Sequence, residues 1–150
     1  MMKLGKMTDY AIVVLTAMAK YGEEPLSSQE LAQSVHLERT TVAKILKMLT
    51  KRGLILSYRG ANGGYRLAKS PDNVSVGQII EAMEGPIGIT ECSVSPGACS
   101  HEAFCSLQSS WKHISAVLER ALYSVSLAQI MAPKASPLSV RLENMALGNP

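Results

Sequence analysis

Three cysteines are the residues of this chain whose type and spacing best suit them for chemistry. Cys92, Cys99 and Cys105 are its only cysteines, in the pattern Cys-x6-Cys-x5-Cys. An odd number cannot close into a disulfide framework, and a loop seldom buries its side chains, so a packing role is disfavoured. Thiolates select zinc, copper(I) or iron–sulfur clusters. Structural zinc sites usually contain a closer cysteine pair, so the spacing favours a cluster over zinc, with free redox thiols as a third reading.

Three thiolates leave a further ligand position open, and several nearby or N-terminal side chains could fill it. For any single one of them, an ordinary surface or helix residue is the favoured interpretation. A weak ligand other than cysteine would make a cluster labile, which is useful in a sensor. The candidates are Asp9, Glu91, His101, Glu102, Gln108 and His113.

The cysteines lie in a segment that begins at Gly85-Pro86 and separates two predicted helices. A loop of roughly twenty residues inside a compact domain is usually functional or disordered. A long helix is predicted after it, over residues 104–131. Its apolar stripe needs a partner, and a second copy in a two-fold dimer is the simplest one. The stripe consists of Trp111, Ile114, Leu118, Leu122 and Val125.

The first half of the chain predicts three helices and a hairpin. Apolar periodicity and capping residues place the helices at 6–21, 27–36 and 39–52, and a fourth at 76–84. Two strands, 54–56 and 65–67, flank a glycine-rich turn. The expected fold is mainly α: a winged helix-turn-helix domain at 2–70, a linking helix and cysteine loop at 71–103, a dimerisation helix at 104–131 and a disordered tail at 132–150.

The third predicted helix has one apolar face and one basic face. Thr40, Thr41 and Lys44 lie near its N-terminal end, where the second helix of a helix-turn-helix meets base edges. Lys47, Lys51 and Arg52 are expected at phosphates, and Arg59 before the wing turn is placed to enter a minor groove. A solvated helix face and an ordinary hairpin turn are the plain alternatives. Ser28, Arg39 and Asn62 complete the predicted DNA-binding set.

Charge and composition agree with a polyanionic partner. The net charge is +3, but residues 1–66 hold ten Lys and Arg against five Asp and Glu, and residues 67–150 hold five against seven. A basic first half is typical of a nucleic-acid-binding domain. No apolar run is long enough to span a membrane, and no signal peptide is evident at the N-terminus, so we expect a cytoplasmic protein.

The wing sequence followed by three spaced cysteines resembles the Rrf family of bacterial transcription regulators. The resemblance covers about residues 2–131 and includes iron–sulfur and nitric-oxide-sensing members. Its segments are Met2-Lys3-Leu4, Thr8-Asp9-Tyr10-Ala11, Thr41-Val42-Ala43-Lys44-Ile45-Leu46 and Arg59-Gly60-Ala61-Asn62-Gly63-Gly64-Tyr65-Arg66-Leu67. Glu84-Gly85-Pro86-Ile87 and Thr90-Glu91-Cys92-Ser93 look closest to the branch that regulates the SUF iron–sulfur assembly operon.

The resemblance implies a homodimer on a two-fold double-stranded DNA operator, with a [2Fe–2S] or [4Fe–4S] cluster on the three cysteines. IscR-like members take a histidine three residues after the last cysteine, where this chain has Gln108. NsrR-like members can use an N-terminal aspartate of the partner subunit, and Asp9 matches that position. We therefore expect Asp9 as the further ligand, ahead of His101 and His113.

These observations predict a repressor that senses an iron–sulfur cluster, and not an enzyme. The resemblance implies that its targets are SUF genes. No nucleophile–base pair or dinucleotide-binding motif is visible, and the three histidines are scattered. A nitric oxide or redox sensor of the same architecture is the nearest alternative. An iron–sulfur carrier or a zinc-stabilised regulator are the others, although a carrier would not need the basic helix and wing.

Overall fold

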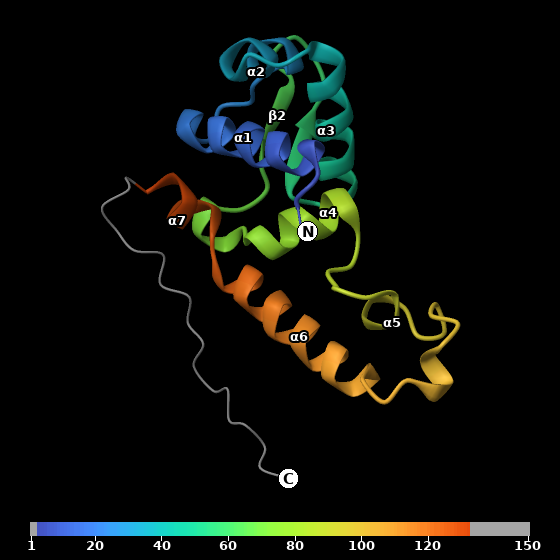
Figure 1. Cartoon of the computed structure of the whole chain (residues 1–150). Helices are drawn as coiled ribbons and strands as arrows, with labels where there is room; N and C mark the ends of the chain where they lie inside the picture. The colour runs from blue at the N-terminus through green and yellow to red at the C-terminus, as the bar shows by residue number, and fades with distance from the viewer. Residues whose placement is uncertain (1–2, 133–150) are drawn as a thin grey trace.

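The computed structural model describes residues 3–132 of the 150-residue chain (Figure 1). Apart from Ala132, the tail predicted at 132–150 lies outside the described residues. The described elements in chain order are α1 (Lys6–Tyr21), α2 (Ser28–Val35), α3 (Arg39–Lys51), β1 (Ile55–Tyr58), β2 (Gly64–Leu67), the 3-10 turn η1 (Pro71–Asn73), α4 (Val76–Glu84), α5 (Glu91–Val94), the 3-10 turn η2 (Glu102–Phe104), α6 (Gln108–Ser124) and α7 (Leu127–Met131).

The first three helices lie close to their predicted bounds, and local capping fixes the ends of α2. Ser27 and Glu30 form the expected capping box at α2: the Glu30 amide donates to the Ser27 hydroxyl at 3.2 Å, and the Ser27 amide donates to the Glu30 carboxylate at 2.8 Å. His36 ends α2 in the left-handed region at φ 54°, with its amide directed at the last carbonyls of the helix. This sharp stop leaves only a short turn before α3.

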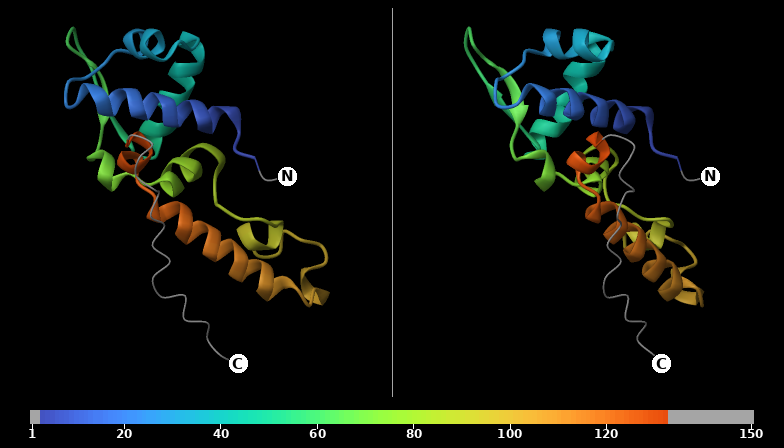
Figure 2. Two further views of the ribbon diagram at one scale, coloured as in Figure 1. Left: turned by 60° about the vertical axis from the view of Figure 1, so that its left-hand side comes forward. Right: turned by 90° about the vertical axis from the view of Figure 1, so that its left-hand side faces the viewer.

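A continuous aliphatic core joins α1, α2, α3 and α4. Helix α1 lies across the other three (Figures 1 and 2) and contacts each of them. Burying each large side chain of this kind stabilises the fold by about 1.5–3 kcal/mol. The fully buried side chains include Val14, Leu15, Leu31, Val42, Ile45, Leu46, Leu49, Ile55 and Ile79.

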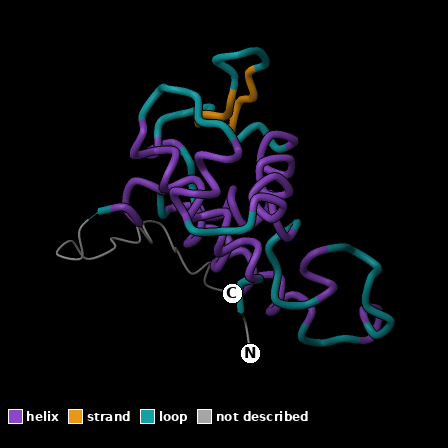
Figure 3. The backbone as a smooth tube through the Cα atoms, turned by 90° about the horizontal axis from the view of Figure 1, so that it is seen from above, coloured by secondary structure: helices purple, strands orange, loops and turns teal. Residues whose placement is uncertain are grey.

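The hairpin projects beyond the helices as a wing, as Figure 3 shows. Strands β1 and β2 pair antiparallel, from Ile55 opposite Leu67 to Tyr58 opposite Gly64. A two-residue bridge ties β2 to the segment before α2, since Leu26 and Tyr65 exchange backbone hydrogen bonds of 2.9 and 2.8 Å. Gly64 permits this approach, because a Cβ there would lie 2.6 Å from the Leu26 carbonyl oxygen. The predicted winged helix-turn-helix fold is confirmed.

Helix α6 leaves the body of the molecule as an arm that is joined to α4 at one end (Figure 2). The Tyr123 ring fills the space in front of Gly77, where any Cβ would collide with it. The Tyr123 hydroxyl donates to the Glu81 carboxylate at 2.5 Å, and this bond raises the pKa of Tyr123 to about 12. A shape fit and one polar bond therefore set where the arm leaves α4.

The single helix predicted over 104–131 is wrong. The structure has η2, then α6, then a break at Val125 and Ser126, and then α7. The break has two causes: Ser126 and Gln129 form a capping box that starts α7, and the Val76 amide donates to the Val125 carbonyl at 2.9 Å. The Ser126-x-x-Gln129 pattern was the sequence signal for this start.

The segment after α4 is also more ordered than a structureless loop. It contains α5 and η2, both too short to show a clear periodicity in sequence.

Within residues 3–132, no helix is long and apolar enough to cross a membrane.

Candidate DNA interface and cysteine loop

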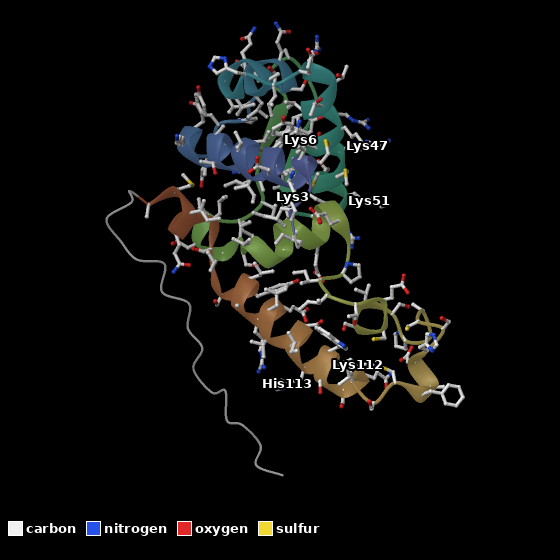
Figure 4. The ribbon with its side chains drawn as sticks, viewed as in Figure 1. Lys3, Lys6, Lys47, Lys51, Lys112 and His113 are labelled. Carbon is white, nitrogen blue, oxygen red and sulfur yellow. The ribbon has the colours of Figure 1, made fainter. Side chains whose placement is uncertain are left out.

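The face of α3 opposite the core is open to solvent and basic. Thr40, Lys44, Lys47 and Lys51 are exposed, and Thr41 is half-buried. Figure 4 shows Lys47 and Lys51 projecting from the outer side of α3, away from the other helices. The apolar residues predicted for the other face are all buried. The two-faced character of this helix is confirmed, and its exposed face is free to meet a partner.

No acidic side chain of the described residues forms an ion pair with the cations of this face. Among residues 3–132 the structure holds one ion pair, Lys112 with Glu102, and it lies far along the arm. The lysines of α3 are therefore available to pair with a polyanion.

The wing and the start of α2 carry the remaining predicted DNA-binding residues. Arg59 and Asn62 are exposed at the wing turn, Ser28 is half-buried at the first position of α2, and Arg39 is exposed at the start of α3. Arg66 on β2 is engaged within the wing, where it donates to the Tyr58 hydroxyl at 2.7 Å and lies 5.3 Å from the centre of that ring.

The first cysteine is buried, contrary to the expectation for a loop. Cys92 lies in α5 and is 6% exposed, while Cys99 and Cys105 are half-buried. Cys92 is buried because it lies in a short helix, α5, that packs against α6. Its sulfur shares a hydrogen bond of 3.2 Å with the Thr90 hydroxyl. All three cysteines are free thiols.

Two polar anchors fasten the cysteine-bearing segment to α6. At its start, the Ile89 amide donates to the hydroxyl of the buried Ser115 at 3.1 Å. Near its end, the Glu102 carboxylate accepts from the side chains of Gln108 and Lys112. It also accepts from the Gly97 amide at 2.5 Å, and this bond is the main cause that lowers the pKa of Glu102. The segment therefore lies alongside α6 and is fixed to it at both ends.

The thiols and neighbouring ligand types do not converge on one point. In the described part of the chain, no three His, Cys, Asp or Glu side chains are grouped so that they could hold a metal ion. A single zinc ion needs four ligands within about 2.3 Å. A cluster spreads its ligands over several irons. The chemistry of three thiols on one segment fits a soft metal centre such as zinc or an iron–sulfur cluster.

The structure separates the candidates for the further ligand. Glu102 and Gln108 are bonded to each other. His101 and Glu91 are exposed. His113 is also exposed, and in Figure 4 it projects from the side of α6 that faces away from the cysteine-bearing segment. Asp9 is exposed in the first turn of α1, on a different element from all of these.

A hydrogen-bonded joint connects the root of the cysteine segment to α1. The N-cap of α1, Gly5, has no side chain to cap the helix, and Glu84 at the end of α4 does so instead. Its carboxylate accepts from the Gly5 amide at 2.8 Å and from the hydroxyl of the fully buried Thr8. A carboxylate at a helix N-terminus is favoured by the helix dipole. Asp9 is the next residue, so this joint also places it.

Sequence reasoning missed the roles of Glu84, Thr90 and Ser115. Glu84 and Gly5 are 79 positions apart, and Ser115 lies 26 positions from its partner. Neither pairing has a local signal. A serine on the apolar side of an amphipathic helix was the one hint that Ser115 has a buried partner.

Similarity to known proteins identifies the family of this chain. Residues 4–133 match the Rrf2 family, described as iron-dependent transcriptional regulators. This chain belongs to the Rrf2 family. Among curated proteins, it is 30% identical over 131 residues to the protein Rrf2 of Nitratidesulfovibrio vulgaris, covering 87% of each. The matched relatives are transcription regulators and not enzymes.

Solved structures of Rrf2-family regulators share the fold. The structure of CymR, the global cysteine regulator of B. subtilis, matches with a TM-score of 0.67 and 31% identity, over 87% of this chain and 97% of that one. The structure of T. potens IscR matches with a TM-score of 0.66 and 28% identity, over 92% of this chain and 93% of that one. The chain is thus a winged-helix, DNA-binding transcription regulator.

Proposed function

We propose that this Rrf2-family regulator is a homodimeric, cytoplasmic repressor that senses an iron–sulfur cluster and controls SUF-type iron–sulfur assembly genes. The observation that carries the proposal is the placement of three free thiols on one segment. That segment is fixed to α6, and its root is joined to α1 through Glu84. In this proposal the basic face of α3 and the wing bind DNA, and the thiols bind the cluster that is sensed. The SUF target rests on the sequence resemblance.

The positions of the α3 residues suit some of them to base contacts and others to phosphate contacts at the operator. Thr40, Thr41 and Lys44 lie in its first two turns, where base edges are within reach when the helix enters the major groove. Lys47, Lys51 and Arg52 lie farther along and suit phosphates, whose contacts are sequence-independent. Arg59 and Asn62 on the wing suit the adjacent minor groove.

This division can be tested by the salt dependence of operator binding. Lys47→Ala should weaken binding to specific and non-specific DNA alike and lower the slope of log K against log salt by about 0.9. Lys44→Ala should weaken binding to the operator more than to non-specific DNA. Lys112→Ala, a lysine on the arm, is the matched control and should leave both affinities unchanged.

A second copy is the partner that best covers the arm. Only Ser115 is buried among the seventeen residues of α6, although the helix is amphipathic. Ile114 is 44% exposed, and Leu118 and Leu122 line an open apolar groove of about 490 Å³ with Leu4 and Ile87. Monomeric proteins seldom leave such a surface uncovered. Pairing of two arms about a two-fold axis would bury it and space the two α3 helices for a palindromic operator.

Cys92, Cys99 and Cys105 would hold the cluster. A bound cluster would supply chemistry sensitive to oxidants, nitric oxide and iron supply. The chain's own residues keep the thiols ready for it: Thr90 bonds to the Cys92 sulfur, and the two anchors keep the segment on α6. Glu102 and Gln108 are bonded to each other and His113 projects away, which leaves the exposed Glu91 and His101 of the segment, and Asp9, as candidates for the further ligand.

Asp9 of the partner subunit would complete the ligand set. It is exposed at the N-terminal end of α1, next to the buried Thr8 that Glu84 holds. Ligation across the dimer would connect the cluster to both α1 helices, which pack directly on α2 and α3. Gain or loss of the ligand could then change the spacing of the two α3 helices, within the limit set by the differential affinity for the two arrangements.

The deciding experiment is an ultraviolet–visible spectrum with iron, sulfide and zinc analysis on protein purified without oxygen. We expect broad absorption near 400 nm with iron and sulfide present, abolished by Cys99→Ser and made less stable by Asp9→Asn. Operator binding with and without the cluster then reports on sensing. A colourless protein that stays free of iron after anaerobic reconstitution, yet binds operator, would overturn the cluster mechanism and keep the DNA-binding function.

Two other regulators fit the same fold. A nitric oxide or redox sensor would carry the same cluster, and parallel exposure to nitric oxide, oxygen and a chelator separates it from an iron–sulfur supply sensor. A regulator without a cluster is favoured by the lack of a converged group of ligands among the described residues. A zinc-replete, colourless protein from anaerobic purification would support that second candidate.

A further inference from the structure

Glu102 occupies the central position of the segment that carries the second and third cysteines. It lies three residues after Cys99 and three before Cys105. Its backbone connects the two: the Glu102 amide donates to the Cys99 carbonyl at 3.1 Å, and the Cys105 amide donates to the Glu102 carbonyl at 3.4 Å. Any change in the place of Glu102 is therefore passed to both cysteines.

Its side chain fixes this position from two directions. One carboxylate oxygen accepts from the Gly97 amide at 2.5 Å, which closes the turn before Cys99. The other accepts from the Gln108 amide group and from the Lys112 ammonium, which lie in the first turns of α6. Gly97 has a φ of 80°, so the turn needs glycine there. One side chain thus closes the turn and attaches it to the arm.

All three partners of the carboxylate are hydrogen-bond donors. A carboxylate accepts at both oxygens, whereas an amide of the same shape would present one acceptor and one donor. The arrangement therefore requires a carboxylate. The side chain of Gln108, a candidate ligand three residues after Cys105, is also hydrogen-bonded to Glu102 in this arrangement.

We infer that Glu102 is the positioning residue of the cysteine segment: its carboxylate holds Cys99 and Cys105 against α6 before any cluster is bound, and it keeps Gln108 out of the ligand set. The inference deepens the proposed function and rests on it for its purpose. The ordering itself is a property of the cluster-free protein. Cys92 is outside this arrangement, because Ser115 and Thr90 hold its surroundings.

Hydrogen exchange of the cluster-free, full-length protein tests the inference without any metal. Glu102→Gln keeps the shape and removes one acceptor, and it should speed exchange of the amides of residues 97–106 by about tenfold, with α3 unchanged. Glu23→Gln is the control, an exposed carboxylate on the winged body, and should change nothing. Lys112→Met should have little effect, since it removes only an exposed pair of 3.5 Å.

The cluster provides an independent second readout. In reconstituted protein, Glu102→Gln should shorten the lifetime of the cluster absorbance in the presence of a chelator several-fold, while Glu23→Gln should not. If the wild type takes up no iron, the proposed function fails, and the exchange experiment still decides the role of Glu102. Unchanged exchange over residues 97–106, or faster exchange that extends through α3, would overturn the inference.

Discussion

The winged body of the molecule and its cysteine arm are built on opposite principles. The body, residues 3–84, buries aliphatic side chains from four helices and a hairpin in one core. The arm, residues 85–124, buries only Cys92 and Ser115. It is held by hydrogen bonds at Ile89, Glu102 and Tyr123, and it exposes large apolar groups, with Phe104 at 91%. A body with its own core can keep its shape, whereas the arm has surface in reserve for a ligand and a partner.

The largest expected difference between the two regions is in the free energy of unfolding that each loses when a leucine is replaced by alanine. Leu46→Ala, in the body, should lower the free energy of unfolding by about 2–5 kcal/mol, because it leaves a cavity in a fully buried site. Leu118→Ala, at a half-buried site on the arm, should cost well under half of that in a dilute, monomeric sample. Urea unfolding followed by circular dichroism measures both. Equal losses would mean that the arm has a core of its own.

The joint between the regions should respond almost as strongly. Thr8→Val removes the buried hydroxyl that donates to Glu84, and we expect a loss of about 1–3 kcal/mol of stability. Thr16→Val, at a half-buried position on the same helix, is the matched control. Thermal unfolding gives the stability change. If Thr8→Val were as mild as Thr16→Val, the joint would not contribute to holding α1.

Whether the exposed apolar stripe of α6 forms the dimer interface can be tested by placing a charge on it. Ile114→Asp puts a carboxylate on the exposed apolar stripe of α6, and the dimer should dissociate at least about tenfold more readily, since an interface would have to bury the charge. Val13→Asp is the control: Val13 is 42% exposed on α1, against 44% for Ile114. Sedimentation equilibrium measures the change. A dimer that tolerates Ile114→Asp but not Val13→Asp would place the interface on the body.

The smallest effect is expected where the arm meets α4, and it should depend on pH. Tyr123 donates to Glu81, and this bond raises its pKa to about 12. A raised pKa means that the bond stabilises the fold fully below pH 10 and that the contribution is lost as the pH rises toward 12. Tyr123→Phe should therefore cost about 1 kcal/mol at pH 8. The difference from wild type should vanish near pH 12 in thermal unfolding, and a constant difference would contradict this assignment.

Much of the body could be predicted from sequence because its signals are local. The capping box of Ser27 and Glu30 and the two faces of α3 each depend on residues within two turns of one another. Such patterns act before tertiary contacts form, so the helices of the body agree with their predicted bounds within one residue. The three cysteines and the basic face were likewise evident from residue type and spacing alone.

Tertiary structure decided how these parts are joined. The break at Val125 depends on a bond to Val76, the cap of α1 comes from Glu84, and the burial of Cys92 depends on α6. These pairs are far apart in sequence, and no periodicity connects a donor to an acceptor that reaches it only after the chain has folded. The sequence by itself determined a winged helix-turn-helix with a cysteine segment; only the fold decided that Glu84 and Glu102 hold that segment to α1 and α6, because a hydrogen bond depends on position in space.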